Sequence, residues 1–340
     1  MKVRFLSALF AAVIVSGTPS AFAAEQTISV YTTREPGLIE PLLAAFTKET
    51  GIAVKTMFVK DGLAERVAAE GERSPADVLM TVDFGNLIDL VEKGLTQPVK
   101  SSVLESAIPA NLRDPNGHWY TLSMRARVLY AEKNLDLDSF TYEQLADPRW
   151  KGKVCIRSGQ HPYNTALIGA YIVHHGEAAT EKWLRGIKAN LGRKATGGDR
   201  DVARDILGGI CDIGIANSYY VGLMRSGKGG AEQKKWGEAI KVILPTFEGG
   251  GTQVNISGAA VARHAPNKDG AVKLLEFLVS DAAQKLYAEA NFEYPVKPGA
   301  PIHPLIAELG TLKVDSIQLT DIARVRKVAS QLVDKTGFDQ

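Results

Sequence analysis

Apolar and polar residues alternate with two different periods along the first part of the chain. Residues 28–32 form a β-rich run, and apolar residues then recur at helical spacing before Gly51, at Leu38, Ile39, Leu42, Leu43 and Phe46. The same succession repeats, with strands predicted at 52–59 and 77–82 and helices at 63–72 and 86–93. Strands that alternate with helices of this length predict an α/β fold, in which helices cover both faces of a mostly parallel sheet.

Two longer runs, 119–130 and 252–261, alternate in the manner of long strands. Arg125 and Arg127 fall on one face of the first run, because successive side chains of a strand point to opposite faces. We interpret both runs as crossovers between two lobes, since 340 residues exceed the about 250 to 300 at which one hydrophobic core usually divides. The predicted N-terminal lobe comprises residues 25–126 and 254–300, and the predicted C-terminal lobe comprises residues 127–253 and 301–340.

The amino terminus has the pattern of a secretory signal peptide. Lys2 and Arg4 precede a mostly apolar run at 5–15, which is too short to span a bilayer, and small residues follow at Ala21 and Ala23. This pattern predicts a leader at residues 1–24 and a soluble protein exported to the periplasm. Without Lys2 and Arg4, the 40 basic residues become 38 and equal the 38 acidic residues. A neutral chain gives no indication of nucleic-acid binding.

The two cysteines, Cys155 and Cys211, allow two interpretations. Both lie in apolar, strand-like runs, so they can be buried thiols, or they can pair in an oxidising compartment. We favour the disulfide, which would place the two cysteines on adjacent strands.

Three tyrosines lie near the ends of predicted strands. The apolar run 210–216 is typical of a buried strand, and Tyr219 and Tyr220 follow it closely. Tyr163 lies in the loop before the helix predicted at 165–175. An adjacent tyrosine pair is ordinarily one core and one rim residue, but open α/β sheets bind ligands outside the carboxyl ends of their strands. If the disulfide forms, the two loops emerge side by side and the three phenols converge.

A cluster of phenols needs a strong cation to ionise at neutral pH, since the pKa of tyrosine is about 10. A bound metal ion supplies that field, and hard phenolate oxygen suits ferric iron better than zinc or copper(I). Three phenolates would leave an octahedral ion half coordinated, so a further anion or a carboxylate is expected. Arg34 and Arg125 could hold an anion by bidentate hydrogen bonds. No phosphate-binding loop, HExxH helix or CxxC motif occurs in the sequence.

Eight stretches carry a resemblance to a known family: LMTVDFGNL (79–87), YEQLADPRWKGKVCIRS (142–158), PYN (162–164), GGD (197–199), ANSYY (216–220), VNISGA (254–259), APNK (265–268) and EYPV (293–296). Together they resemble the bacterial periplasmic ferric-iron-binding proteins, the substrate-binding components of iron ABC importers. The resemblance covers nearly the whole mature chain. It implies the two-lobed type II periplasmic-binding-protein fold, a binding protein rather than an enzyme, and an inner-membrane ABC permease as partner. We further expect a monomer.

The resemblance also implies the ligands of Fe(III). In that family a tyrosine pair and the tyrosine of a Tyr-Asn loop bind iron, which implies Tyr163, Tyr219 and Tyr220 here. Many members carry Arg-His-Tyr in the first loop, whereas this chain has Arg34, Glu35 and then a proline. The histidine and tyrosine ligands of that loop are therefore absent, and Glu35 is a candidate additional ligand.

Some members of the family combine three tyrosines with a carbonate held by arginines, and Arg34 and Arg125 match those positions. Fe(III) with a synergistic anion such as carbonate is therefore the expected cargo. One alternative keeps the fold and binds another small ligand, such as thiamine, a polyamine or a phosphonate-type anion. A cation such as thiamine would require converging aromatic faces and carboxylates, which the arginines do not fit. A second alternative, an enzyme, lacks a nucleophile and base at suggestive spacing.

Overall fold

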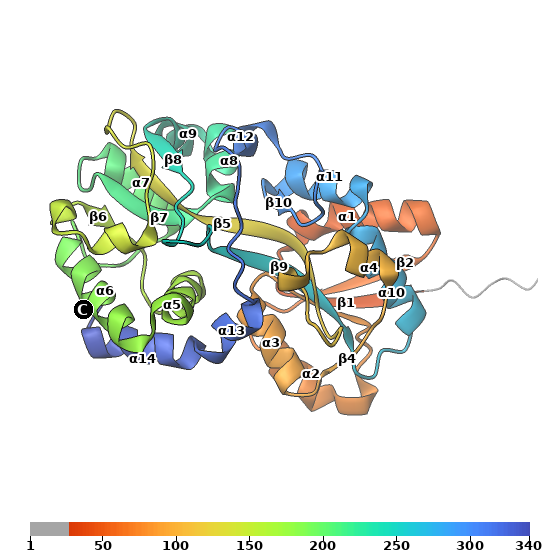
Figure 1. Ribbon diagram of the computed structural model, residues 1–340. Helices are drawn as coiled ribbons and strands as arrows, with labels where there is room; N and C mark the ends of the chain where they lie inside the picture. The colour runs from red at the N-terminus through yellow and green to blue at the C-terminus, as the bar shows by residue number, and fades with distance from the viewer. Residues whose placement is uncertain (1–26) are drawn as a thin grey trace, which may run out of the picture.

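Two α/β lobes lie side by side and are joined by two long strands (Figure 1). The computed structural model describes residues 27–340, so the predicted leader at 1–24 lies outside the described residues. The strands are β1 (Thr27–Thr32), β2 (Ala53–Phe58), β3 (Val78–Thr81), β4 (Thr96–Gln97), β5 (Tyr120–Glu132), β6 (Val154–Cys155), β7 (Ile213–Asn217), β8 (Ile240–Ile243), β9 (Val254–Ala262) and β10 (Tyr294–Pro295). Their order is β2-β1-β3-β9-β5-β7-β6, with β4 paired to β9 and both β8 and β10 paired to β5.

Helices cover both faces of the sheet in each lobe. They are α1 (Pro36–Thr50), α2 (Leu63–Glu70), α3 (Phe84–Glu92), α4 (Ser102–Ala107), α5 (Pro162–His175), α6 (Glu177–Asn190), α7 (Asp199–Leu207), α8 (Tyr219–Arg225), α9 (Ala231–Glu238), α10 (Lys268–Leu278), α11 (Asp281–Asn291), α12 (Pro304–Ala307), α13 (Leu319–Arg324) and α14 (Arg326–Thr336). Four short 3-10 helices lie at Gly71–Arg73, Ala110–Leu112, Tyr142–Ala146 and Pro148–Trp150. Within residues 27–340, no helix combines the length and the hydrophobicity that crossing a membrane requires.

The N-terminal lobe contains the parallel strands β2, β1 and β3. On α1, the predicted apolar stripe is buried at Ile39, Leu42 and Phe46, and the helix ends at Gly51, whose φ of 73° is left-handed. Such a backbone favours glycine, because the Cβ of other residues is strained against the backbone in this conformation. The prediction of alternating strands and helices is confirmed.

Strand β5 belongs to both lobes. Its first half pairs antiparallel with β9, down to Ala126 opposite Val254. From Arg127 onward it pairs with β7 instead. The change of partner marks the place where the chain passes from one lobe to the other, and β5 and β9 correspond to the two predicted crossovers.

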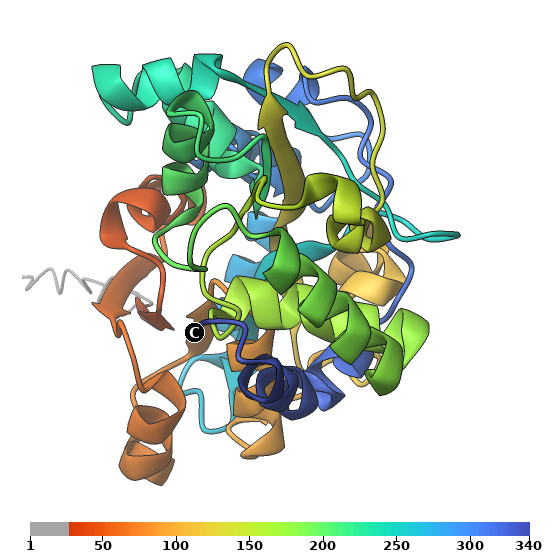
Figure 2. The ribbon, with the colours of Figure 1, turned by 90° about the vertical axis from the view of Figure 1, so that its left-hand side faces the viewer.

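The C-terminal lobe contains β6, β7 and β8 with the helices α5 to α9, and the terminal helix α14 packs against α5 and α6. In Figure 2, which views this lobe from the side, α14 is the dark-blue helix beside the green pair. Cys155 and Cys211 form a disulfide with a Cα–Cα distance of 5.8 Å. The predicted disulfide is confirmed.

The strand predicted at 210–216 is shorter than expected and begins at Ile213. Gly209 adopts a left-handed φ of 70°, and the turn it makes leaves the Ile210 side chain 46% exposed. Cys211 therefore lies just before β7, not within it. The helix predicted at 165–175 begins earlier, at Pro162, because proline at the first helical position has no N–H to leave unpaired and its φ suits a helix.

A long connection, residues 296–318, leads from β10 back to the C-terminal lobe; we call it the return segment. Its short helix α12 packs against α8. Further along, the Thr252 N–H donates to the Lys313 carbonyl and the Asp315 N–H donates to the Thr252 carbonyl. The return segment is thereby tied to the residues just before β9.

Candidate metal centre

The tyrosine pair opens helix α8 directly after β7. Ser218 makes the turn: its N–H donates to the Ala126 carbonyl, and its hydroxyl accepts from the Ala126 N–H at 3.1 Å. Tyr219 and Tyr220 are half-buried, and their ring centroids lie 4.0 Å apart. Because the strand has already turned into a helix, the two adjacent phenols serve one site instead of opposite faces of a sheet.

Tyr163 is the second residue of α5. Its N–H donates to Nδ1 of His161 at 3.2 Å, and the two rings meet edge to face with centroids 4.5 Å apart. Three guanidinium groups surround the Tyr163 ring, with carbon-to-centroid distances of 5.3 Å for Arg157, 5.8 Å for Arg125 and 6.0 Å for Arg127. This tyrosine therefore lies in a strongly positive environment.

The three phenols influence one another electrostatically. Burial raises the pKa of Tyr219 well above its usual value, with further upward contributions from Tyr163 and Tyr220. Burial also raises the pKa of Tyr220, and Tyr163 and Asp199 add to the effect. The structure thus brings the three predicted tyrosines into one cluster.

Asp199 organises the polar groups beneath the cluster. It is fully buried at the first position of α7, and one carboxylate oxygen accepts from Arg127 Nη1 at 2.6 Å and from the Asn217 N–H at 2.8 Å. Its other oxygen accepts from Arg157 at 3.3 Å. Arg127 also donates to the Asn164 amide oxygen at 2.5 Å, beside Tyr163. One carboxylate therefore fixes two of the three guanidinium groups around Tyr163.

Arg125 joins the tyrosines to the N-terminal lobe. Its side chain is 3% exposed and donates to the carbonyls of Val82 and, at 2.6 Å, Ile256. Burial alone would lower the pKa of Arg125, but Glu293 and the nearby phenols of Tyr163 and Tyr219 outweigh it, and the pKa is raised. Arg125, which was predicted from the sequence to bind an anion, therefore lies beside the phenols.

Arg34 is buried and already has partners. Its Nη2 donates to both carboxylate oxygens of Glu293, at 2.9 and 3.0 Å, and to the Ser257 hydroxyl. Burial would raise the pKa of the Glu293 carboxyl, but Arg34 and Arg125 outweigh it and the pKa is lowered. Arg34 therefore forms part of an ionised network with Glu293.

Glu35 precedes α1, is exposed, and makes no capping hydrogen bond to the helix. Its proposed role as an additional ligand stays a prediction.

His174 and His175 lie at the end of α5. They are paired with Asp315 and Glu143, at 3.0 and 2.7 Å.

Several residues of the site were not assigned from the sequence. Arg127 was recognised as sharing a face with Arg125 but received no role, and Arg157 and Asp199 lay inside family-like motifs without being singled out. Glu293 is 259 residues from Arg34, so no local pattern could pair them. The Gly-Gly-Asp sequence at 197–199 was the one signal that could have drawn attention to Asp199.

Several buried hydrogen-bond donors at the site are unpaired within the described residues. Within residues 27–340, the buried Nε–H groups of Arg34, Arg125, Arg127 and Arg157 have no hydrogen-bond partner, and neither has the side-chain nitrogen of Asn217. Buried donors without partners are costly, so they are a feature of sites prepared for an anion or another acceptor. Among residues 27–340, no group of three His, Cys, Asp or Glu side chains is arranged to hold a metal ion. Phenol oxygens are the hard donors that converge here.

A cleft between the lobes is lined by Pro162, the residue before Tyr163. It has a volume of about 180 Å³, and its walls are the start of α3, the start of α5 and Arg326. Arg326 Nη2 lies 2.5 Å from the Asp89 carboxylate across this cleft. The phenols therefore lie close to where the two lobes meet.

Two lobes joined by crossover strands, with polar donors converging beside the cleft, define a solute-binding protein. A family model described as bacterial extracellular solute-binding protein matches residues 73–308. The chain belongs to this family.

Individual relatives show which solute-binding proteins the chain resembles. Iron uptake protein A1 of Synechocystis is 40% identical over 317 residues, which cover 92% of this chain and 88% of that protein. The solved Bordetella ferric binding protein is 67% identical with a TM-score of 0.90, covering 93% of this chain and 100% of that one. A Trichodesmium structure in complex with iron and citrate ligands is 42% identical with a TM-score of 0.87, covering 92% and 99%. The predicted two-lobed periplasmic-binding-protein fold is confirmed.

Proposed function

We propose that this chain captures ferric iron between its lobes, with Tyr163, Tyr219 and Tyr220 as phenolate ligands. The observation that carries the proposal is the convergence of three phenols on a cluster of buried guanidinium groups. Relatives named for iron uptake and for ferric binding support it. Fe(III) is the cargo, and no catalytic role is proposed for any side chain.

An anion completes the coordination sphere in this proposal. Three phenolates balance the charge of Fe(III) but leave coordination positions open. The unpartnered Nε–H groups of Arg125, Arg127 and Arg157 are donors that an anion such as carbonate can use. Arg34, whose Nη2 remains on Glu293, has an unpartnered Nε–H of the same kind. This assignment adds two arginines to the pair expected from the sequence.

The lobes close around the iron by bending near residues 125–128 and 252–255, where β5 changes partner and β9 begins. We divide the chain there into an N-terminal lobe of 25–126 and 254–300 and a C-terminal lobe of 127–253 and 301–340. Hinged closure is the usual response of such proteins to their ligands. Small-angle scattering should show a smaller radius of gyration with iron than without it, and an equal radius would contradict closure.

In this proposal the loaded protein is a monomer in the periplasm that delivers iron to an inner-membrane ABC permease. A binding protein of the extracellular solute-binding family works in that compartment, and the relatives named for iron uptake fit this route.

The visible spectrum of the purified protein tests the proposal. Iron-free protein titrated with ferric citrate should develop a phenolate-to-iron charge-transfer band that saturates at one equivalent. Bicarbonate-free buffer should weaken binding if carbonate completes the sphere. Tyr31→Phe is a matched control, because its phenol bonds Glu70 in the N-terminal lobe. A colourless ferric complex would overturn the assignment of the ligands.

A further inference from the structure

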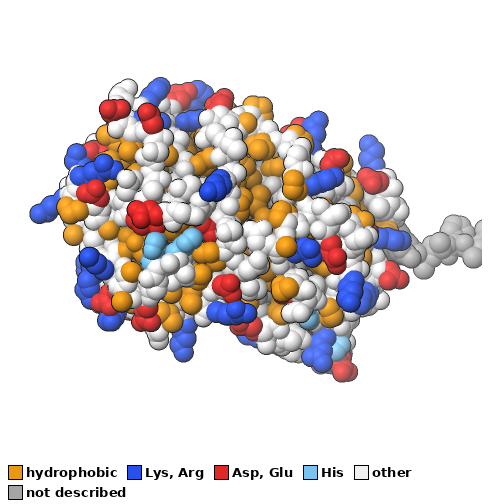
Figure 3. All heavy atoms as spheres, in the orientation of Figure 1, with side chains coloured by type: hydrophobic (Ala, Val, Ile, Leu, Met, Phe, Trp, Pro, Cys, Tyr) orange, Lys and Arg blue, Asp and Glu red, His pale blue; other side chains and the backbone are white. Residues whose placement is uncertain are grey.

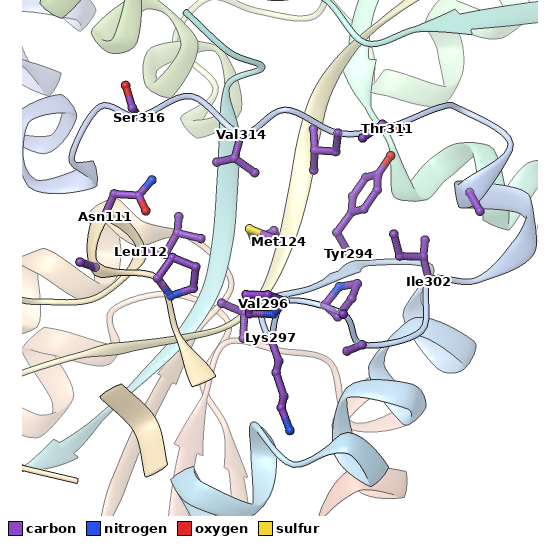
Figure 4. Close-up of a pocket in the computed structure, with 18 of the residues that line it drawn as sticks. Asn111, Leu112, Met124, Tyr294, Val296, Lys297, Ile302, Thr311, Val314 and Ser316 are labelled. Carbon is purple, nitrogen blue, oxygen red and sulfur yellow. The ribbon is translucent and has the colours of Figure 1, made fainter. Parts of the chain in front are cut away.

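The chain beyond β10 meets the C-terminal lobe in two stretches. The first, the return segment, borders a groove of about 970 Å³ beside β5 (Figure 4). In Figure 3, hydrophobic side chains gather on this face between the two lobes. Met124 lines the groove, whereas the guanidinium group of the next residue, Arg125, lies 5.8 Å from the centre of the Tyr163 ring. The groove and the tyrosines therefore lie on opposite faces of β5, and it is the second stretch, residues 319–340, that reaches the loop before Tyr163.

Asp339, which follows α14, holds the β6–α5 loop, which comprises residues 156–161. One of its carboxylate oxygens accepts from the Gly159 N–H at 2.7 Å. The other accepts from the Ser158 hydroxyl at 2.6 Å and from the Gln160 N–H at 3.4 Å. Hydrogen bonds to an ionised carboxylate are stronger than those between neutral groups. One side chain therefore fixes two successive peptide groups of the loop.

The β6–α5 loop also packs tightly against the residues beside Asp339. Gly159 is buried, and a Cβ at that position would lie 2.9 Å from the Phe338 ring and 2.9 Å from the Val333 side chain. The loop can lie on α14 because position 159 carries no side chain. Phe338 is 1% exposed, and its N–H donates to the Val333 carbonyl at 3.0 Å. The turn after α14 thus anchors Phe338 in the core and presents Asp339 to the loop.

The β6–α5 loop leads directly into the helix start that carries Tyr163. The His161 N–H donates to the Ser158 carbonyl at 3.2 Å, and the His161 carbonyl accepts from the Asn164 N–H at 2.8 Å. The Asn164 side-chain nitrogen donates to the same Ser158 carbonyl at 3.0 Å. Ser158 is therefore held by Asn164 through its carbonyl and by Asp339 through its hydroxyl. A displacement of the loop would displace Tyr163 relative to the tyrosine pair, which lies on a different helix.

We propose that Asp339 is a positioning residue for iron binding: its carboxylate fixes the β6–α5 loop and thereby places the Tyr163 phenol opposite the tyrosine pair. The inference rests on the proposed function, because Asp339 can influence iron by this route only if Tyr163 is a ligand. Removing an outer group that orients the ligands of a metal typically lowers its affinity about 10- to 100-fold. A ligand that is held in place before binding also avoids the entropic cost of ordering it.

Substitutions near the carboxyl end of the chain test the role of Asp339. Asp339→Ala removes all three hydrogen bonds and should weaken iron binding about tenfold in competition with citrate. Its charge-transfer band should also move, because one phenolate meets the iron in a changed geometry. Asp339→Asn should stay within about threefold of the wild type, since its carbonyl can accept from Gly159 and its amide nitrogen can donate to Ser158. The matched control is Asp321→Ala, which removes a carboxylate paired with the exposed Arg324 and should bind iron as the wild type does.

Hydrogen exchange of the iron-free protein tests the loop itself. The amides of Gly159 and Gln160 should exchange about tenfold faster in Asp339→Ala than in the wild type, since they lose their acceptor. The amides of β7 should exchange at the wild-type rate, which separates a local loosening from a loss of overall stability. Unchanged exchange at Gly159 and Gln160 would show that the carboxylate does not hold the loop, and would overturn the proposal.

The double variant Tyr163→Phe, Asp339→Ala separates this proposal from the proposed function. If Asp339 acts through the Tyr163 phenol, adding Asp339→Ala to Tyr163→Phe should cause no further loss of affinity, because the effects of coupled residues are not additive. A further loss of about tenfold, or wild-type affinity in Asp339→Ala alone, would overturn the positioning role while leaving Tyr163 as a ligand. Full affinity in Tyr163→Phe alone would instead overturn the ligand itself.

Discussion

The two lobes prepare the proposed iron site in different ways. The C-terminal lobe supplies all three phenols from two helix starts, and Asp199 and the Cys155–Cys211 disulfide fix the elements that carry them. The N-terminal lobe offers Arg125, Arg34, which is engaged by Glu293, and the exposed Glu35. In the proposed function, one lobe therefore holds the ligands in place before iron arrives, while the other supplies charge and closes over them.

Removing the tyrosine pair should have the largest effect on this division of labour. The double variant Tyr219→Phe, Tyr220→Phe deletes two hard anionic ligands, so affinity should fall by more than the about 10- to 100-fold typical of changing an outer partner of a ligand. The charge-transfer band should disappear. Retention of full affinity in competition with citrate would show that the C-terminal lobe does not hold the iron through these phenols.

Lowering the pH should have the second-largest effect on iron binding. Burial raises the pKa of both Tyr219 and Tyr220, so both phenols are protonated at neutral pH in the iron-free protein and must lose a proton to bind. Affinity therefore rises with pH and falls as pH decreases, by about tenfold per pH unit for each proton released. Citrate competition across pH 6 to 8 (about two units) gives the slope. A slope near zero would contradict phenolate ligation.

Asp199→Asn should weaken iron binding by about tenfold without removing a ligand. The neutral amide leaves Arg127 and Arg157 without their buried anion, so the free energy of unfolding should also fall, by about 3 kcal/mol. Urea unfolding and citrate competition measure the two effects. Asp201→Asn, on the same helix but paired with the exposed Arg204, is the matched control. If Asp199→Asn bound iron with unchanged affinity, the buried network around Asp199 would have no influence on iron binding.

Glu35→Gln should have the smallest effect, a change in affinity of less than about twofold, as expected for an exposed carboxylate with little electrostatic influence. Citrate competition with and without bicarbonate tests it. A large loss that is indifferent to bicarbonate would show that the Glu35 carboxylate completes the sphere in place of an anion, and would give the N-terminal lobe a direct ligand.

Periodicity was sufficient to predict most elements and both crossovers, because helices and strands are local patterns. The same patterns failed at Ile210, where a left-handed glycine ended the apolar run early. The tyrosine cluster followed from strand ends and the disulfide. The partners of Arg34 and Arg127 did not, because Glu293 and Asp199 reach them only through the folded chain.

Three consecutive residues, Phe292, Glu293 and Tyr294, touch three different parts of the molecule. The Phe292 ring lies so close to Gly222 of α8 that no side chain would fit at position 222. Glu293 holds Arg34, and Tyr294 pairs with Met124 of β5 in the sheet. Linkage follows from such a connection: a change at this tripeptide that favours the closed arrangement of the lobes would tighten iron binding, and iron would favour that arrangement by the same factor. A substitution in this tripeptide would then change the protein's iron affinity without removing any of the proposed ligands.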